Sequence, residues 1–220
     1  MKIDIVGAGI AGLAIAWELV RAGASVEILD RGLAGQGATW ASGGMLAPGA
    51  ELGAEETPLA RFAHESRKAW NDFARTLREA SGADIGFRED GAFLVAANEA
   101  RARDLSSVAT ATGDLWLDIP SARQREPLLS PDLAGVLFVP GDAQVDNRAL
   151  GLALAAALRR AGVGVRQNCA VHSVALADGR AVGVLTAQGA VMADAVILAC
   201  GASLNRIGGL PPGTIPPVRP

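Results

Sequence analysis

Tyrosine is absent from the 220 residues of this chain, and cysteine and histidine occur only twice each. Cys169 and Cys200 are far apart in the sequence and form no C-x-x-C pair, so neither a zinc site nor a redox pair is indicated. His64 and His172 are equally isolated and lack nearby partners for a metal ion. We therefore predict no metal site, and we interpret both cysteines as small buried hydrophobic residues.

The chain also has no run of basic residues, and its net charge of -3 makes it a poor candidate for nucleic-acid binding. The apolar stretch from Ile5 to Ala16 is shorter than the roughly 20 residues of a membrane span. Residues 22–24, A-G-A, resemble a signal-peptidase site, but the glycines before them would weaken an export helix. We predict a cytoplasmic protein without nucleic-acid or membrane partners, with export as the alternative and a homo-oligomer left open.

Glycine, in contrast, is abundant, with 27 residues, well above the average share of about 7%. Residues 7–12 read G-A-G-I-A-G, which is the pattern G-x-G-x-x-G. The motif follows an apolar strand at 3–6 and opens a helix at 11–21, and Asp30 closes a second strand at 25–29. These three contexts together predict a dinucleotide site in a βαβ unit.

Each glycine of the motif has a separate physical role. Gly7 makes the tight turn, Gly9 lets the backbone approach a pyrophosphate, and Gly12 lets helix and strand pack closely. Ile10 and Ala11 lie at the start of this helix, where free N–H groups and the helix dipole favour an anion. We therefore predict that residues 7 to 12 hold the pyrophosphate of a dinucleotide.

Asp30 is predicted to accept hydrogen bonds from ribose hydroxyls, and its carboxylate argues against a 2′-phosphate and hence against NADP. The spacing of these residues does not separate FAD from NAD, because both cofactors use this type of site. An NAD-linked dehydrogenase therefore stays an alternative on the motif alone.

Further elements follow from periodicity and caps. Thr57 as N-cap and Pro58 at the first helical position begin an amphipathic helix that Gly82 closes. The remaining expectations are a hairpin or strand at 87–96, a helix at 99–110, a proline-punctuated connection at 118–140, a helix at 147–160 capped by Asp146, strands at 163–167, 170–176, 180–186 and 195–199, and a hairpin turn at Asp178-Gly179.

Longer stretches of the sequence resemble one known family. Asp30-Arg31 followed by A-T-W-A-S-G-G-M-L-A-P at 38–48 is similar to the signature of the FAD-dependent D-amino-acid oxidase superfamily, and most similar to glycine oxidases of the thiamine-biosynthesis type. The similarity continues in G-F-R at 86–88 with Gly91, R-E-P at 125–127, P-G-D at 140–142 with Val145-Asp146, A-D-A-V-I-L-A-C-G-A at 193–202 and P-V-R-P at 217–220.

The resemblance implies FAD as the cofactor and assigns residues to its parts. Asp30 and Arg31 would contact the adenosine ribose, and Val171 would meet the adenine through its backbone. The implied contacts along the ribityl chain and the flavin ring are Thr39, Ser42, Gly43, Gly44 and Met45. Where the chain passes close to the cofactor a second time, the implied contacts are Cys200, Gly201 and Ala202. Ser42-Gly43 departs from the more usual Ala-Ala, and Cys200 replaces a small residue.

The resemblance also implies an α/β fold. The expected architecture is a Rossmann-type FAD-binding domain, with its GxGxxG βαβ unit, formed by residues 1–50 and 141–210. Residues 51–140 would form an excursion that includes part of an α+β substrate domain, and residues 211–220 would begin a truncated strand of that domain.

The implied activity is oxidation of the C–N bond of glycine or another small amino acid or amine to an imine, with oxygen reduced to hydrogen peroxide. The family's substrate-carboxylate arginines and active-site aromatic residues belong to the part after P-V-R-P, so the catalytic residues stay unknown, and the absence of tyrosine agrees with this. The alternatives are a non-catalytic FAD-binding fragment or an FAD-dependent amino-acid dehydrogenase. We expect the 220-residue chain to bind FAD weakly and to make no peroxide.

Overall fold

The computed structural model describes residues 1–53 and 57–210. The chain divides into two compact units. Unit 1 comprises residues 1–43, 76–85 and the chain from 147 onward, and unit 2 comprises 44–75 and 86–146. The sequence predicted that residues 51–140 interrupt the first domain. In the structure the second unit begins at residue 44, and residues 76–85, which include the end of a long helix, belong to unit 1. The assignment of the units to FAD and substrate stays a prediction, and the expected strand at 211–220 lies outside the described residues.

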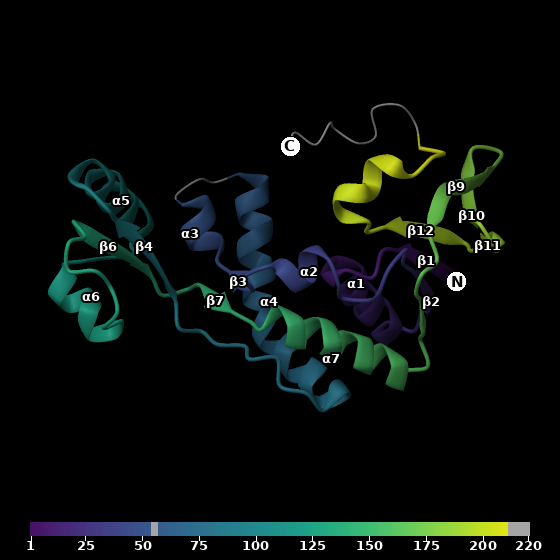
Figure 1. Cartoon of the computed structure of the whole chain (residues 1–220), viewed down its shortest axis with the longest axis horizontal. Coiled ribbons are helices and arrows are strands. Elements are labelled where there is room, and N and C mark those ends of the chain that lie inside the picture. Colours follow the sequence, from purple (N-terminus) through teal and green to yellow (C-terminus); the bar gives the residue numbers. More distant parts are fainter. Residues whose placement is uncertain (54–56, 211–220) are drawn as a thin grey trace. The chain divides into compact units, whose positions relative to one another are not determined.

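Unit 1 is built on a parallel four-stranded sheet with the order β12-β1-β2-β8. Figure 1 labels β12, β1 and β2 of this sheet. Its strands are β1 (Lys2–Val6), β2 (Ser25–Leu29), β8 (Val165–Arg166) and β12 (Ala195–Leu198). β1 pairs in parallel with both β2 and β12, so the first βαβ unit lies at the centre of the sheet. The predicted α/β fold with a parallel sheet is confirmed.

Two helices and an antiparallel meander complete unit 1. The helices α1 (Ile10–Arg21) and α7 (Asn147–Arg160) pack against each other, and α1 also contacts β2. The meander consists of β9 (Val171–Ala177), β10 (Arg180–Thr186) and β11 (Gly189–Met192). Val6, Leu29, Cys169 and Val184 form a shared core between the parallel sheet and this meander. The shorter elements of the unit are α2 (Ala38–Ala41) and the 3₁₀ helix η1 (Gly201–Arg206).

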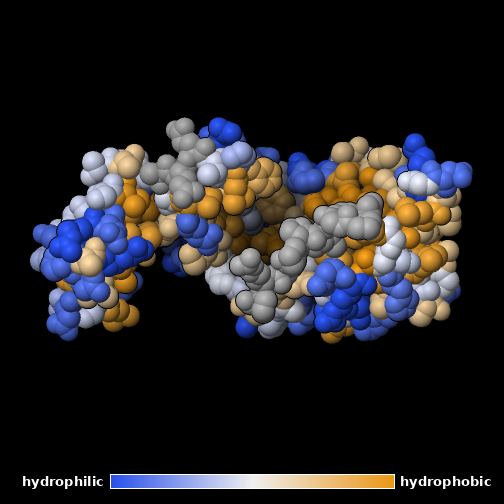
Figure 2. Space-filling view, turned by 90° about the horizontal axis from the view of Figure 1, so that it is seen from above, coloured by the Kyte–Doolittle hydropathy of each residue, from blue (hydrophilic) through white to orange (hydrophobic). Residues whose placement is uncertain are grey.

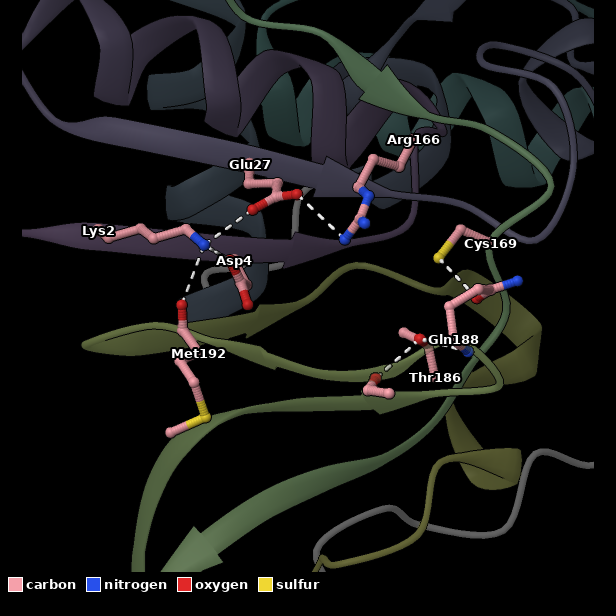
Figure 3. Close-up of polar contacts among 9 residues, drawn as sticks. Lys2, Asp4, Glu27, Arg166, Cys169, Thr186, Gln188 and Met192 are labelled. Carbon is pink, nitrogen blue, oxygen red and sulfur yellow. Dashed lines mark hydrogen bonds and ion pairs between the residues drawn. The ribbon is translucent and has the colours of Figure 1, made fainter.

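A buried carboxylate interrupts the apolar strand β1. Asp4 has no exposed surface, and its oxygens accept no hydrogen bond from any described residue. Lys2 Nζ lies 3.7 Å from Asp4 Oδ1, but it pairs with Glu27 at 2.8 Å and donates to Met192 O at 3.0 Å (Figure 3). Burial raises the pKa of Asp4 from 3.8 to about 6, although the charge of Lys2 opposes this shift. Asp4 is therefore a buried carboxylate whose charge is only weakly offset by Lys2.

Unit 2 contains a three-stranded antiparallel sheet with the order β4-β6-β5. β6 (Gly135–Val139) lies between β4 (Ala92–Ala96) and β5 (Leu115–Leu117), and α5 (Glu99–Thr112) and α6 (Ile119–Arg125) pack against β6. The remaining elements of the unit are the paired strands β3 (Met45–Leu46) and β7 (Ala143–Gln144) and the helix α3 (Pro48–Leu52).

The interpretation of residues 118–140 as a connection was wrong, because this stretch contains α6 and the central strand β6. All five residues of β6, G-V-L-F-V, are buried, so they show no alternation of polar and apolar side chains that would reveal a strand. The strand expected at 87–96 is shorter than predicted, because only 92–96 pair with β6.

The long helix α4 (Pro58–Ser81) is confirmed with both of its predicted ends. Thr57 Oγ1 accepts a hydrogen bond from the Ala60 backbone N–H at 3.1 Å, as expected of an N-cap, and Gly82 has φ +70°. The Asp178-Gly179 turn is also confirmed, because both residues have positive φ between β9 and β10. These signals are local, and the structure follows them.

Apolar side chains remain on the surface of both units, as the orange areas in Figure 2 show. Those of the meander in unit 1 include Leu176, Leu185 and Met192, which are 53%, 41% and 57% exposed. Among the described residues, none of the helices is both long and apolar enough to cross a membrane. The same part of the chain contains no group of three acidic, histidine or cysteine residues arranged to hold a metal ion.

Candidate functional site

In the loop between β1 and α1, the packing of the protein requires glycine at two of the three motif positions. Gly7 has φ +111°, and a Cβ there would lie 2.3 Å from the Ala199 carbonyl oxygen. A Cβ on Gly12 would lie 1.9 Å from the Gly7 carbonyl oxygen. The loop therefore passes tightly between α1 and the end of β12, which brings the helix N-terminus to the carboxyl edge of the sheet.

Gly9 differs from these two glycines. Its backbone has φ -75° and ψ -177°, which any residue can adopt. The nearest atom to a Cβ built there is Thr39 Oγ1 at 3.4 Å, an ordinary contact. The packing of the protein itself therefore does not require glycine at this position, and the predicted contact of Gly9 with a pyrophosphate stays a prediction.

The N-terminus of α1 offers hydrogen-bond donors beside Gly9. The first intrahelical bond runs from Leu13 N–H to Gly9 O at 3.0 Å, so the N–H groups before Leu13 have no helical acceptor. Thr39 Oγ1 accepts the hydrogen bond of Ile10 N–H at 2.8 Å, whereas no acceptor from the described residues meets Ala11 N–H. Free donors and the helix dipole at this point favour an anionic group.

Asp30 links two loops at the same edge of the sheet. Its Oδ2 accepts a hydrogen bond from Ala8 N–H at 2.6 Å, and its Oδ1 accepts one from Gly32 N–H at 2.7 Å. Each carboxylate oxygen has two lone pairs, so both can also accept a ribose hydroxyl. The role as ribose ligand stays a prediction. The structure adds that Asp30 holds the glycine loop in place, which the sequence did not show.

We expect Asp30→Ala to raise the dissociation constant for FAD at least tenfold, because it removes charge-assisted hydrogen bonds of roughly 1.5 to 3 kcal/mol each. Titration of the chain with FAD, followed by flavin fluorescence, measures the constant. Asp30→Asn is the matched control: it keeps one oxygen for the loop and loses the charge. Equal constants for wild type and Asp30→Ala would show that Asp30 is not the ribose ligand.

A cavity of unit 1 at this site has a volume of about 630 Å³. The glycine loop contributes Gly7, Gly9, Ile10 and Ala11 to its wall. The end of β2 contributes Asp30 and Arg31, the α2 region contributes Thr39 and Ser42, and the chain after β12 contributes Cys200, Gly201 and Ala202. Segments that are far apart in the sequence thus surround one hollow at the carboxyl ends of parallel strands, which is where dinucleotides bind in such sheets.

A second cavity of about 230 Å³ shares Gly7, Asp30, Arg31, Cys200 and Ser203 with the first. Its other walls include Val171, at the start of β9, together with Leu29 and Ile207. Because Asp30 borders both hollows, a dinucleotide could place its ribose between them and its base in the smaller, largely apolar one.

Four of the predicted site residues do not line either cavity. Gly12 is buried and acts through packing. Gly43 is the last residue of the first segment of unit 1, and Gly44 and Met45 belong to unit 2. Their predicted contacts with the flavin therefore stay predictions. Conversely, the cavity residues that the sequence did not predict include His172, Ser203 and Arg206, since no motif spacing relates them to the glycine loop.

The two cysteines are free thiols in different surroundings. Cys169 is buried in the core and its Sγ lies 3.8 Å from Gln188 Oε1, as Figure 3 shows. Cys200 is half-buried, borders both cavities, and donates to Val6 O at 3.4 Å. Burial raises the pKa of Cys200, so it faces the site as a neutral thiol. The interpretation as a buried hydrophobic residue fits Cys169 better than Cys200.

Asn147, the first residue of α7, holds the segment that carries Thr39. Its Nδ2 donates to Thr39 O at 2.5 Å and to Trp40 O at 3.1 Å. We expect Asn147→Ala to raise the FAD dissociation constant about threefold to tenfold, because the two lost hydrogen bonds let Thr39 move away from the helix N-terminus. Leu152→Ala, at an exposed position on the same helix, is the control in the same titration. An unchanged constant for Asn147→Ala would contradict this positioning role.

Comparisons with known proteins agree with the geometry. Residues 2–220 match the family described as FAD dependent oxidoreductase. Glycine oxidase of Geobacillus kaustophilus is 35% identical over 212 residues, which cover 94% of this chain and 56% of that protein. Its crystal structure superposes with a TM-score of 0.86 over 94% of this chain and 57% of that one.

Two further relatives carry names other than glycine oxidase. A bifunctional protein ThiO/ThiG of Synechocystis is 35% identical over 209 residues, covering 94% of this chain and 31% of that protein. A 4-methylaminobutanoate oxidase (formaldehyde-forming) of Paenarthrobacter nicotinovorans is 34% identical over 208 residues, covering 91% and 24%. The chain thus spans about half the length of the glycine oxidase and less of the other two.

Proposed function

Because the chain belongs to the FAD dependent oxidoreductase family, we propose that it holds FAD in the two cavities of unit 1 and serves an enzyme that oxidises the C–N bond of glycine or another small amino acid or amine. The observation that carries the proposal is Gly9, which the protein leaves open beside the free donors of the α1 N-terminus. An enzyme of this kind would take the small amino acid or amine as its substrate partner.

The residues of the site fit the parts of FAD. Gly9 and the N–H of Ala11 would meet the pyrophosphate, Asp30 the adenosine ribose, and the apolar cavity beside Val171 the adenine. The isoalloxazine ring supplies the hydride-accepting chemistry when FAD is bound. The contribution of this chain is to bind the cofactor and fix its orientation, since the flavin carries the redox chemistry.

The names of the relatives support the substrate class. Glycine oxidase and 4-methylaminobutanoate oxidase are both named for oxidation of an amine-bearing compound. Reduction of oxygen to hydrogen peroxide is part of the proposal. An FAD-dependent amino-acid dehydrogenase and a cofactor-binding unit without chemistry of its own are the alternatives. A location in the cytoplasm is likewise proposed.

The test uses the purified 220-residue chain and, in parallel, the whole open reading frame that encodes it. FAD titration followed by the flavin absorption spectrum measures binding. Anaerobic addition of glycine, sarcosine or D-alanine then shows whether the bound flavin is bleached, and admission of oxygen with a peroxide assay separates an oxidase from a dehydrogenase. We expect weak FAD binding without peroxide from the 220-residue chain. Tight binding with turnover by the product of the reading frame is the result expected of the proposed enzyme. Failure of both to bind FAD would refute the proposal.

A further inference from the structure

The smaller cavity contains an arginine that the cofactor assignments above do not use. Arg206 is the last residue of η1 and lines this cavity, but it does not line the larger one at the glycine loop. It forms no ion pair and no hydrogen bond with any other residue in the described part of the chain. A guanidinium without a protein partner at the wall of a cavity is available to a ligand.

The backbone holds this arginine in place. Gly208 N–H donates to His172 O at 2.8 Å, and Val174 N–H donates to Gly208 O at 2.9 Å, so the segment after η1 is bonded to β9. A Cβ on Gly209 would lie 2.6 Å from Val174 O, and the residue has φ +80°. Glycine at this point lets the chain lie directly on β9. As a result, the backbone that follows Arg206 is bonded to β9, and Arg206 lines the same cavity as Val171, the residue assigned to the base.

The surroundings of Arg206 indicate which part of a dinucleotide it would contact, the base or the phosphates. The cavity is walled largely by apolar groups, among them Leu29, Val171 and Ile207, which suit a flat aromatic ring. The charged groups that face it are Asp30, Arg31 and Arg206, with His172 beside them. The donors suited to a pyrophosphate lie instead at the α1 N-terminus in the larger cavity. Arg206 is therefore at the base end of the site.

We infer that Arg206 is an adenine-recognition residue, whose planar guanidinium stacks on the base of the bound dinucleotide and closes the apolar cavity over it. Arginine suits this role because its guanidinium stacks on aromatic faces, whereas the compact ammonium of lysine does not. Since Arg206 is exposed, substitutions there leave the core intact. This inference rests on the proposed binding of FAD.

The experiment compares FAD dissociation constants of wild type and three variants at Arg206 by fluorescence titration. Arg206→Ala is expected to raise the constant roughly fivefold to twentyfold, Arg206→Lys to raise it nearly as much, and Arg206→Phe to keep it within about threefold of wild type, because only Phe retains a stacking plane. Arg159→Ala, which removes the same charge from the end of α7, is expected to leave the constant unchanged. Thermal unfolding of each apo variant checks that the fold is intact.

The ranking of the variants decides the inference. An affinity that follows the presence of a planar group, with Phe above Lys and Ala, supports stacking on adenine. Any other ranking overturns it: equal affinity of Ala and wild type shows no contact, and recovery by Lys but not by Phe shows recognition of charge. If wild type itself binds no FAD, the proposed function fails and this inference fails with it, which a titration of wild type alone reveals.

Discussion

Gly9→Val is expected to abolish FAD binding while the chain stays folded. The valine side chain would occupy the space through which the pyrophosphate approaches the α1 N-terminus, and the loss of two charge-assisted hydrogen bonds alone raises the dissociation constant about a hundredfold or more. The protein itself accepts a Cβ here, because the backbone of Gly9 is ordinary and the nearest atom to its Cβ position is Thr39 Oγ1 at 3.4 Å. Fluorescence titration with FAD, run in parallel on wild type, measures the loss of binding.

Gly12→Ala is the matched comparison, because it changes the same motif by a single methyl group. Its Cβ would lie 1.9 Å from the Gly7 carbonyl oxygen, so α1 must move and the free energy of unfolding should fall by about 1 to 3 kcal/mol. Urea unfolding therefore separates the two glycines: Gly12→Ala loses stability, and Gly9→Val does not. An FAD dissociation constant of Gly9→Val equal to that of wild type would show that residues 7 to 12 are not the phosphate loop.

The second large effect concerns Asp4 and the pH dependence of stability. The pKa of Asp4 is raised to about 6 in the folded chain, against 3.8 for the free side chain. Between these values the folded state binds more protons than the unfolded state, so stability falls as pH rises through this window. A difference of about two pKa units corresponds to about 3 kcal/mol, fully lost above about pH 6.

Asp4→Asn should remove this dependence, because the amide does not ionise. We expect the variant to gain about 2 to 3 kcal/mol relative to wild type when urea unfolding is moved from about pH 4 to about pH 8. Glu18→Gln, at an exposed carboxylate on α1 that pairs with Arg21, controls for the change in net charge. A stability difference between Asp4→Asn and wild type that is the same at both pH values would contradict a raised pKa at this position.

The elements that the sequence predicted well are those specified by a few consecutive residues. Thr57, Pro58 and Gly82 set the ends of α4, and Asp178-Gly179 sets a hairpin turn. In each case a cap or a positive φ is a demand of the local backbone, so it can be recognised without knowing what lies nearby. The central strand β6 was missed because all five of its residues are buried, so no alternation of polar and apolar side chains marks it as a strand.

The candidate site divides in the same way. The sequence by itself determined the family resemblance, the G-x-G-x-x-G loop and the acidic residue at the end of β2, because strand, turn and helix must follow one another directly for a dinucleotide to reach the helix N-terminus. Only the tertiary structure decided that Asp30 holds the loop through Ala8, that Gly9 is open while Gly12 is closed, and that Arg206 lies beside Val171. These facts depend on side chains and segments brought together by packing, and sequence spacing does not encode such distances.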